Sequence, residues 1–248
     1  NTGVPGYQWY GEVIVFPPDP QNDWWATPVP AAYPRPLHPG WYQLPKLLQR
    51  TGHQGQEQGR LLRDGVLFRD GTGSIWQWRG CTDFLLFLLF LRGVDIAPIL
   101  QERLALGFNV LRVLGMVAWA ELNGEFFPQQ WPLYYAKLGA FADSLAAHGL
   151  RMEFVVFADA QLVMPNEAEQ DVHADRVMDT LRDKWNVTIE WCNAPFKNIP
   201  GGAARAHAIG KRWQGRTSLL MASGAGQLDI AEGDFAQVEY RDGQRLFV

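Results

Sequence analysis

From residue 61 onward, the spacing of hydrophobic and polar positions switches repeatedly between the period of a strand and that of a helix. Short strand-like runs, almost wholly apolar at residues 109–117, predict strands at residues 109–117, 151–158, 186–192 and 218–222, with residues 237–240 as a candidate sixth strand. Apolar residues three and four apart predict helices at residues 96–106, 134–148, 169–184 and 205–213. Such alternation is typical of a parallel sheet covered by helices, either an open doubly wound sheet or a barrel.

Two further segments precede this repeat. Residues 65–68 and 75–78 have a strand-like pattern and flank the glycine-containing segment 69–73 (RDGTG), so we predict a hairpin. The apolar run 84–91 (FLLFLLFL) follows, and its eight residues are too few to cross a membrane, which takes about 20. We expect this run to pack against a lid or a partner.

The first 45 residues differ in composition from the rest of the chain. They hold ten of the sixteen prolines, together with Trp9, Trp24, Trp25 and Trp41. Proline removes backbone donors and excludes helix and inner strand, whereas four tryptophans favour burial against a surface. We therefore predict that residues 1–60 form an extended arm and hinge, which lies either on its own domain or on a neighbouring subunit.

Composition and charge exclude several classes of function. A formal net charge of −4 without a basic block argues against a nucleic-acid-binding protein. No glycine-rich phosphate motif follows the first strand, so we expect no dinucleotide, and we predict neither a cofactor nor a metal site. Cys81 and Cys192 match no zinc site or disulfide framework, so we predict free thiols, with a single bridge as the alternative.

Three short motifs fall at related places in the repeat. Residues 76–83 (WQWRGCTD) lead from the hairpin into the first strand, residues 107–113 (GFNVLRV) join a helix end to the second, and residues 193–196 (NAPF) close the fourth. In order and spacing, these motifs resemble the cellulase-type retaining glycoside hydrolases over residues 65–248. The resemblance implies an α/β fold of the TIM-barrel type, (β/α)8, here incomplete, with about six β/α units over residues 61–248.

The resemblance also shows where the catalytic groups of that family stand. Its fourth strand ends in Asn-Glu-Pro, where the glutamate is the acid/base, and a second glutamate on the seventh strand is the nucleophile. The reaction needs these two carboxyl groups about 5 to 5.5 Å apart. Here Ala194 stands at the acid/base position, and the predicted strands end before a seventh. No catalytic carboxylate is therefore assigned, and truncation of a longer chain or assembly with another chain stays open.

The resemblance also implies two residues that bind and orient the substrate. By this resemblance, Arg112 supports the nucleophile carboxylate and Asn193 bonds a sugar hydroxyl near the scissile bond. The alternatives are an ion pair within the barrel mouth for Arg112 and a turn before proline for Asn193. We expect Glu190, which lies inside the fourth strand, to be a buried structural carboxylate, and His173, on a helix, to be a surface residue.

Other candidate sugar ligands follow from where barrel sites lie. Active sites occupy the carboxyl ends of barrel strands, and Asp83 and Asp159 each follow a predicted strand. Either carboxylate can bind a ligand or cap the next helix. Trp119 and Trp191 are candidate glycan platforms, because a pyranose ring presents a flat apolar face of C–H groups. Ordinary loop packing is the alternative for these aromatic residues.

Three functions stay open at this point. The first, which we favour because of Ala194, is a barrel that binds polysaccharide or oligosaccharide without cleaving it, as a glycan-binding or structural module of an extracellular or virion assembly. Residues 1–60 would then contact neighbouring subunits. The second is a retaining β-glycosidase of the endoglucanase type, present as a fragment or inactivated at the acid/base. The third is an architectural subunit with no ligand.

Overall fold

A computed structural model of the chain describes residues 59–64, 67–119 and 125–222. Nearly all of the predicted arm, and the predicted strand at residues 237–240, lie outside the described residues. Within them, the predicted strands and helices from residue 96 to residue 222 are present, with ends that differ by a few residues.

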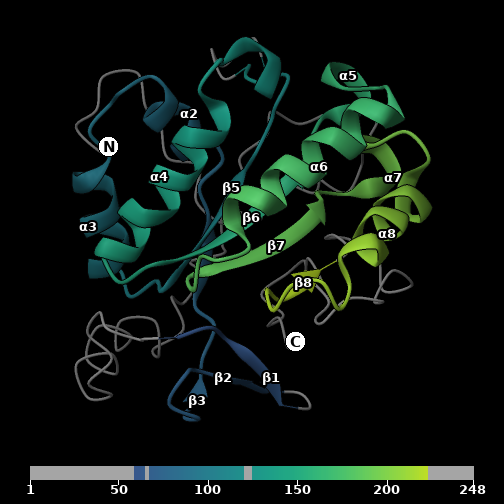
Figure 1. Ribbon diagram of the computed structural model, residues 1–248. Helices are drawn as coiled ribbons and strands as arrows, with labels where there is room; N and C mark the ends of the chain where they lie inside the picture. The colour runs from purple at the N-terminus through teal and green to yellow at the C-terminus, as the bar shows by residue number, and fades with distance from the viewer. Residues whose placement is uncertain (1–58, 65–66, 120–124, 223–248) are drawn as a thin grey trace, which may run out of the picture.

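Five parallel strands form the main sheet, and they are hydrogen-bonded in the order in which they occur along the chain (Figure 1). They are β4 (Gly80–Thr82), β5 (Val110–Leu114), β6 (Arg151–Phe157), β7 (Val187–Cys192) and β8 (Met221–Ala222). An open doubly wound sheet reverses its strand order at a switch point, and the described sheet has no such reversal. The sheet is therefore part of a barrel, which confirms the predicted α/β fold of the TIM-barrel type.

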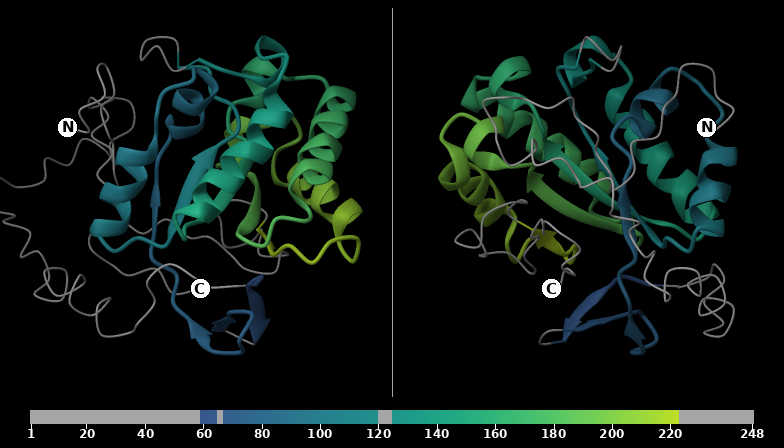
Figure 2. Two further views of the ribbon diagram at one scale, coloured as in Figure 1. Left: turned by 60° about the vertical axis from the view of Figure 1, so that its left-hand side comes forward. Right: turned by 180° about the vertical axis from the view of Figure 1, so that it is seen from behind.

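Helices cover the outer face of the curved sheet (Figures 1 and 2). They are α2 (Leu86–Leu91), α3 (Ala97–Ala105), α4 (Tyr134–Ala147), α5 (Ala160–Val163), α6 (Glu167–Leu181), α7 (Pro195–Asn198) and α8 (Gly202–Trp213). A 3-10 turn, η2 (Pro128–Gln130), precedes α4. Asn166 caps α6, because its side-chain oxygen accepts hydrogen bonds from the amides of Ala168 and Glu169.

The apolar run at residues 84–91 packs inside the domain itself. Most of it forms α2, and Leu86, Phe87 and Leu88 are at most 1% exposed. The ring of Phe87 lies 5.2 to 5.3 Å from the rings of Phe141 and Tyr134 on α4. The expectation that this run packs against a lid or a partner was wrong, because the run is the contact between α2, α4 and the sheet.

The inner face of α6 includes His173, for which we expected a surface position. Val172 is 59% exposed, whereas His173 is 1% exposed and packs against the ring of Phe157 at the end of β6. The buried positions of this helix are Gln170, His173, Ala174, Val177, Met178 and Leu181. The expectation of a surface position for His173 is therefore corrected: a helical period that starts from Leu181 turns His173, and not Val172, toward the sheet.

A small antiparallel sheet closes the amino-terminal end of the barrel strands (Figure 1). The predicted hairpin forms β2 (Leu67–Arg69) and β3 (Ile75–Trp76), and β1 (Leu62–Asp64), which the sequence did not predict, pairs with β2. The apolar cluster that joins the two sheets contains Leu61, Phe68, Trp76, Val110, Leu220 and Ala222. This end of the barrel is therefore a packed plug.

Cys81 and Cys192 are both buried and free, which confirms the predicted thiols. Among the described helices, none has the length and apolar character that crossing a membrane requires.

Candidate functional site

Arg112 and Glu190 form a two-pronged ion pair toward the carboxyl end of the parallel strands. The Nε atom of Arg112 donates to Oε2 of Glu190 at 2.6 Å, and Nη2 donates to Oε1 at 2.7 Å. Nη2 also donates to Oδ1 of Asn193 at 3.2 Å. The Glu190 side chain is fully buried and that of Arg112 is 11% exposed, so the pair is shielded from water. Such fork-shaped, charge-assisted pairs are strong and hold both partners in one geometry.

The strand register brings these two residues to the same face. β5 and β7 both pair with β6, where Arg112 is opposite Glu153 and Glu190 is opposite Val155. Side chains alternate between the two faces of a strand, so Glu153 and Val155 point the same way, and so do their partners. Arg112 and Glu190 therefore meet across β6 on the inner face of the sheet. The structure places Arg112 in an ion pair with a carboxylate of its own barrel, the alternative stated for it above.

The chain turns sharply after Glu190. The amide of Asn193 donates to the carbonyl of Phe157 at 2.8 Å, and Asn198 Nδ2 donates to the carbonyl of Asn193 at 2.6 Å. Ala194, between them, has φ of 41° and ψ of 66°, and it is the one non-glycine residue with positive φ in the described ranges. A residue with a Cβ is strained there, by about 1–2 kcal/mol. This turn places Ala194, which carries no acidic group, at the end of the fourth parallel strand.

Asp159 and Cys192 lie beside the ion pair. Asp159 Oδ2 accepts a hydrogen bond from the Ala118 amide at 2.9 Å, which joins the segments that follow β6 and β5. Asp159 does not cap α5 through its side chain. Burial raises the pKa of the Cys192 thiol well above its usual range, and the negative charges of Glu190 and Asp159 raise it further. Cys192 is therefore a protonated thiol and not a nucleophile.

Asp83 faces the helix layer and not the inner face of the sheet. Thr82 is in register with Arg112, so Asp83, one residue later, points the opposite way. There its Oδ2 accepts hydrogen bonds from Nη2 and Nε of Arg103 at 3.0 and 3.2 Å, and both side chains are almost fully buried. Burial raises the pKa of Asp83 from 3.8 to about 6, despite the opposing charge of Arg103. The structure thus gives this predicted sugar ligand a structural partner.

The two candidate tryptophans lie in different layers. Trp119 is half-buried and meets Phe84 edge-on, with ring centroids 5.2 Å apart. Trp191 follows Glu190 and therefore points to the helix side, where it is 2% exposed against Gly210 of α8. The expectation that Trp191 is a glycan platform is therefore corrected, because no face of its ring is open to a ligand. Trp119 stays a candidate.

The described residues hold no cluster for metal binding, and neither Glu190 nor Ala194 supplies a free acid. No group of three or more metal-ligating side chains occurs in the ranges 59–64, 67–119 and 125–222. At the described carboxyl ends of the strands, Glu190 is held by Arg112, and Ala194 offers no proton. The arrangement can therefore orient polar ligand groups, and these residues supply no free acid for bond cleavage.

Sequence reasoning missed two features of this region. It placed Glu190 inside its strand as a buried carboxylate, but it did not pair Glu190 with Arg112, because partners two strands apart depend on register. It also missed the contact between Tyr135 and the buried His173, in which the Tyr135 hydroxyl lies 2.9 Å from Nδ1 of His173. The signal for this contact was the place of His173 on the same helical face as Val177 and Leu181.

Solved structures of glycoside hydrolases share this fold. A glycoside hydrolase family 5 protein from Bacteroides vulgatus ATCC 8482 aligns with a TM-score of 0.51 at 13% identity, over 67% of this chain and 39% of its own. The β-glucanase SdGluc5_26A from Saccharophagus degradans aligns with a TM-score of 0.52 at 15% identity, over 75% of this chain and 62% of its own. Its complex with cellotetraose aligns with a TM-score of 0.52 at 14% identity, over 79% and 66%.

No family model and no curated protein matches the sequence. The chain spans less than two thirds of the length of each of these three structures. At identities of 13% to 15% the likeness shows the fold alone. The described residues have the fold of a cellulase-type glycoside hydrolase barrel, in incomplete form, and the resemblance seen in the sequence is confirmed at this level.

Proposed function

We propose that this glycoside-hydrolase-like barrel binds a neutral polysaccharide or oligosaccharide at the carboxyl end of its sheet without hydrolysing it. The observation that carries the proposal is the turn at residues 193–195, where Asn193 is held by Arg112 while Ala194 occupies the end of the fourth strand. In this proposal Arg112 and Asn193 orient the ligand, whereas Ala194 has a methyl group where the family has its proton donor.

Asn193 is the central contact in this proposal. Its Oδ1 atom accepts a hydrogen bond from Arg112, and its Nδ2 group donates to no residue in the described part of the chain, so both donors can reach a sugar hydroxyl. The ion pair with Glu190 fixes Arg112, so the amide is oriented before a ligand arrives, and such preorganisation lowers the cost of binding. Asp159 offers a carboxylate nearby, and Trp119 offers part of a ring for stacking.

The assignment as a non-catalytic site rests on the state of the carboxylates. Retaining hydrolysis needs one carboxyl group to protonate the leaving oxygen and a second to attack the sugar. Glu190 is fully buried and has both oxygens bound to Arg112, so it can serve neither purpose. We place this module in an extracellular or virion assembly, with residues 1–60 contacting neighbouring subunits, because of the proline- and tryptophan-rich composition of that segment.

A titration of cello- and manno-oligosaccharides into the full chain by isothermal calorimetry tests the binding proposal. We expect saturable binding of at least one neutral oligosaccharide, about tenfold or more weaker in Asn193→Ala, because a site built to bond a hydroxyl loses a paired polar group. Lys184→Ala, which removes a partly exposed cation paired with Asp143, is the control and leaves affinity unchanged. Release of reducing sugar by the unmodified chain would contradict the non-catalytic assignment.

The alternative of a β-glycosidase inactivated at its acid/base is favoured by one observation. Ala194 lies between Asn193 and Pro195 at a strand end, where a single substitution to glutamate creates the family motif. If Ala194→Glu hydrolyses a β-linked oligosaccharide that the unmodified chain only binds, this alternative holds. Absence of hydrolysis together with retained binding supports the binding module, and absence of both supports the architectural subunit.

A further inference from the structure

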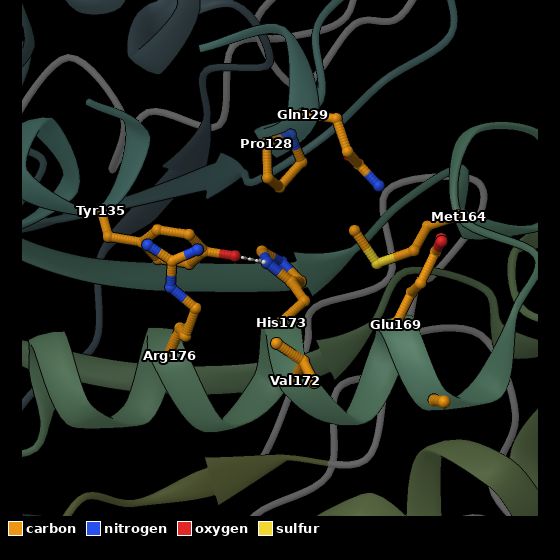
Figure 3. A pocket seen from close by; sticks show the side chains of 9 residues that line it. Pro128, Gln129, Tyr135, Met164, Glu169, Val172, His173 and Arg176 are labelled. Atoms are coloured by element: carbon orange, nitrogen blue, oxygen red, sulfur yellow. Dashed lines mark hydrogen bonds between the residues drawn. The ribbon is translucent and has the colours of Figure 1, made fainter. Parts of the chain in front are cut away.

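A cavity of about 390 Å³ opens in the helix layer, between α6 and the segment that leads into α4 (Figure 3). Its walls are largely apolar, and Pro128, Met164 and Val172 contribute to them. Pockets that hold small ligands span roughly 300–1,000 Å³, so the volume suits a small organic molecule. None of the residues of the proposed glycan site lines this cavity, so the two sites are separate.

The guanidinium group of Arg176 stacks on an aromatic ring at one end of the cavity. The guanidinium carbon of Arg176 lies 3.8 Å from the centre of the Tyr135 ring, and Figure 3 shows the two groups one above the other. The Tyr135 hydroxyl is in turn bound to Nδ1 of the buried His173 at 2.9 Å, which fixes the ring. A guanidinium stacked in this way keeps its N–H edges free for a planar, two-oxygen anion.

Arg176 forms no hydrogen bond or ion pair through its side chain with any residue in the described ranges. Nearby arginines behave differently: Arg182, which caps the end of α6, is paired with Asp179, and Arg205 of α8 is paired with Asp171 of α6. Beside this unpaired cation, Val172 leaves 59% of its surface exposed. A ligand with one anionic group and an apolar body would satisfy the cation and cover the apolar wall together.

The negative charge of Glu169 limits which anionic ligands the cavity can hold. Glu169 lines the cavity two helical turns before Arg176, and its carboxylate disfavours a dianion such as a phosphate monoester. The largely apolar walls also disfavour a free sugar, whose hydroxyls would lose water without gaining partners. The remaining class is a monoanionic acid with a flat apolar body.

We propose that this cavity binds a small aromatic carboxylate. Its two oxygens accept hydrogen bonds from Arg176, and its ring lies against Pro128, Met164 and Val172. The ligand would be recognised by charge at one end and by apolar contact along its body, independently of any glycan bound at the barrel mouth.

Methyl NMR of the full chain, labelled with 13C at the methionine methyl groups, tests this proposal with phenylacetate as the probe. The chain has five methionines, all of them buried, and Met164 is the one of the five that lines the cavity. We expect a saturable shift of the Met164 signal and little change in the other four. Phenylacetamide, which has the same shape without the charge, should bind at least about tenfold more weakly.

Three variants separate the cation from the apolar wall. Arg176→Gln should weaken phenylacetate binding about tenfold or more, and Val172→Trp, at an exposed helical position, should fill the cavity and abolish binding. Arg182→Gln removes a cation of the same helix that lies away from the cavity, and it should leave the affinity unchanged. Equal binding of acid and amide, an unaffected Arg176→Gln variant, or no Met164 shift at millimolar phenylacetate would each overturn the proposal, and none of them bears on glycan binding.

Discussion

Arg112 and Glu190 bind each other through both carboxylate oxygens, although the strands that carry them are separated by β6. The pair therefore crosses the inner face of the sheet and joins β5 to β7 without a backbone contact between these strands. Because Arg112 also donates to Asn193, the same pair fixes the turn that carries Ala194.

Removal of one partner of this pair should cost more than removal of both. Arg112→Met leaves the fully buried Glu190 charge without its partner, and loss of one member of a buried pair costs about 3–5 kcal/mol of unfolding free energy. Glu190→Met should have a similar effect, whereas the double variant should lose much less than the sum. Urea unfolding of the four proteins measures this coupling, and additive losses would show that the pair contributes no stability.

Ala194→Gly should stabilise the protein. The positive φ of Ala194 brings its Cβ close to its own backbone, and glycine relieves a strain of about 1–2 kcal/mol there, minus the greater freedom of glycine in the unfolded chain. We expect a net gain of up to about 1 kcal/mol and a rise in Tm of about 2–4 °C by calorimetry. Ala140→Gly, at an exposed position within α4, is the control and should lower stability by about 0.5–1 kcal/mol.

Stability should fall below neutral pH because of His173. Burial lowers the pKa of this imidazole from 6.5 to about 3, so the unfolded chain binds a proton between these values and the folded chain does not. The stability contributed by the neutral ring is present above pH 6.5 and is lost as the pH falls toward 3, by at most about 1.4 kcal/mol per pH unit.

Unfolding free energies of the natural chain and of His173→Phe, measured from pH 7 to pH 4.5, isolate this effect. The difference between the two proteins should shift in favour of the variant as the pH falls. A difference that stays constant over this range would mean that the pKa of His173 is the same in the folded and the unfolded chain.

Two glycines on helices should respond in opposite directions to alanine. A Cβ on Gly210 of α8 would lie 2.7 Å from Nε1 of the buried Trp191, so Gly210→Ala should cost about 1–3 kcal/mol. A Cβ on Gly139 of α4 meets Thr180 at 3.4 Å, an ordinary contact, and Gly139→Ala should gain about 0.5–1 kcal/mol. Thermal unfolding compares the two directly, and a tolerated Gly210→Ala would mean that Trp191 moves.

The repeat of strands and helices could be predicted because it depends on local spacing. Residues 151–157 and 187–192 are buried along their whole length, and a continuous apolar run signals such strands. β1 could not be predicted in the same way, because its three residues gain a strand conformation from pairing with β2 and carry no pattern of their own.

The faces of elements were harder to predict than the elements. Alternation along β7 implies that Trp191 points away from the face that carries Glu190, and the prediction of Trp191 as a glycan platform ignored that alternation. His173 was predicted to lie on the surface because histidine is polar. Its position in the helical repeat, however, puts it on the same buried face as Val177. The ion pair between Arg112 and Glu190 depends on the register of three neighbouring strands. Local patterns in a single sequence do not indicate that register.

The apolar plug at the amino-terminal end of the strands has a consequence for how a polymer can reach the inner face of the barrel. Trp76 and Phe68 of the small sheet pack against Val110, Leu220 and Ala222 at that end. In the proposed function, a polysaccharide therefore has to lie across the opposite rim, where the carboxyl ends of the strands are. A polysaccharide that binds there needs no free chain end. Long polysaccharides with blocked ends should therefore bind as well as short ones.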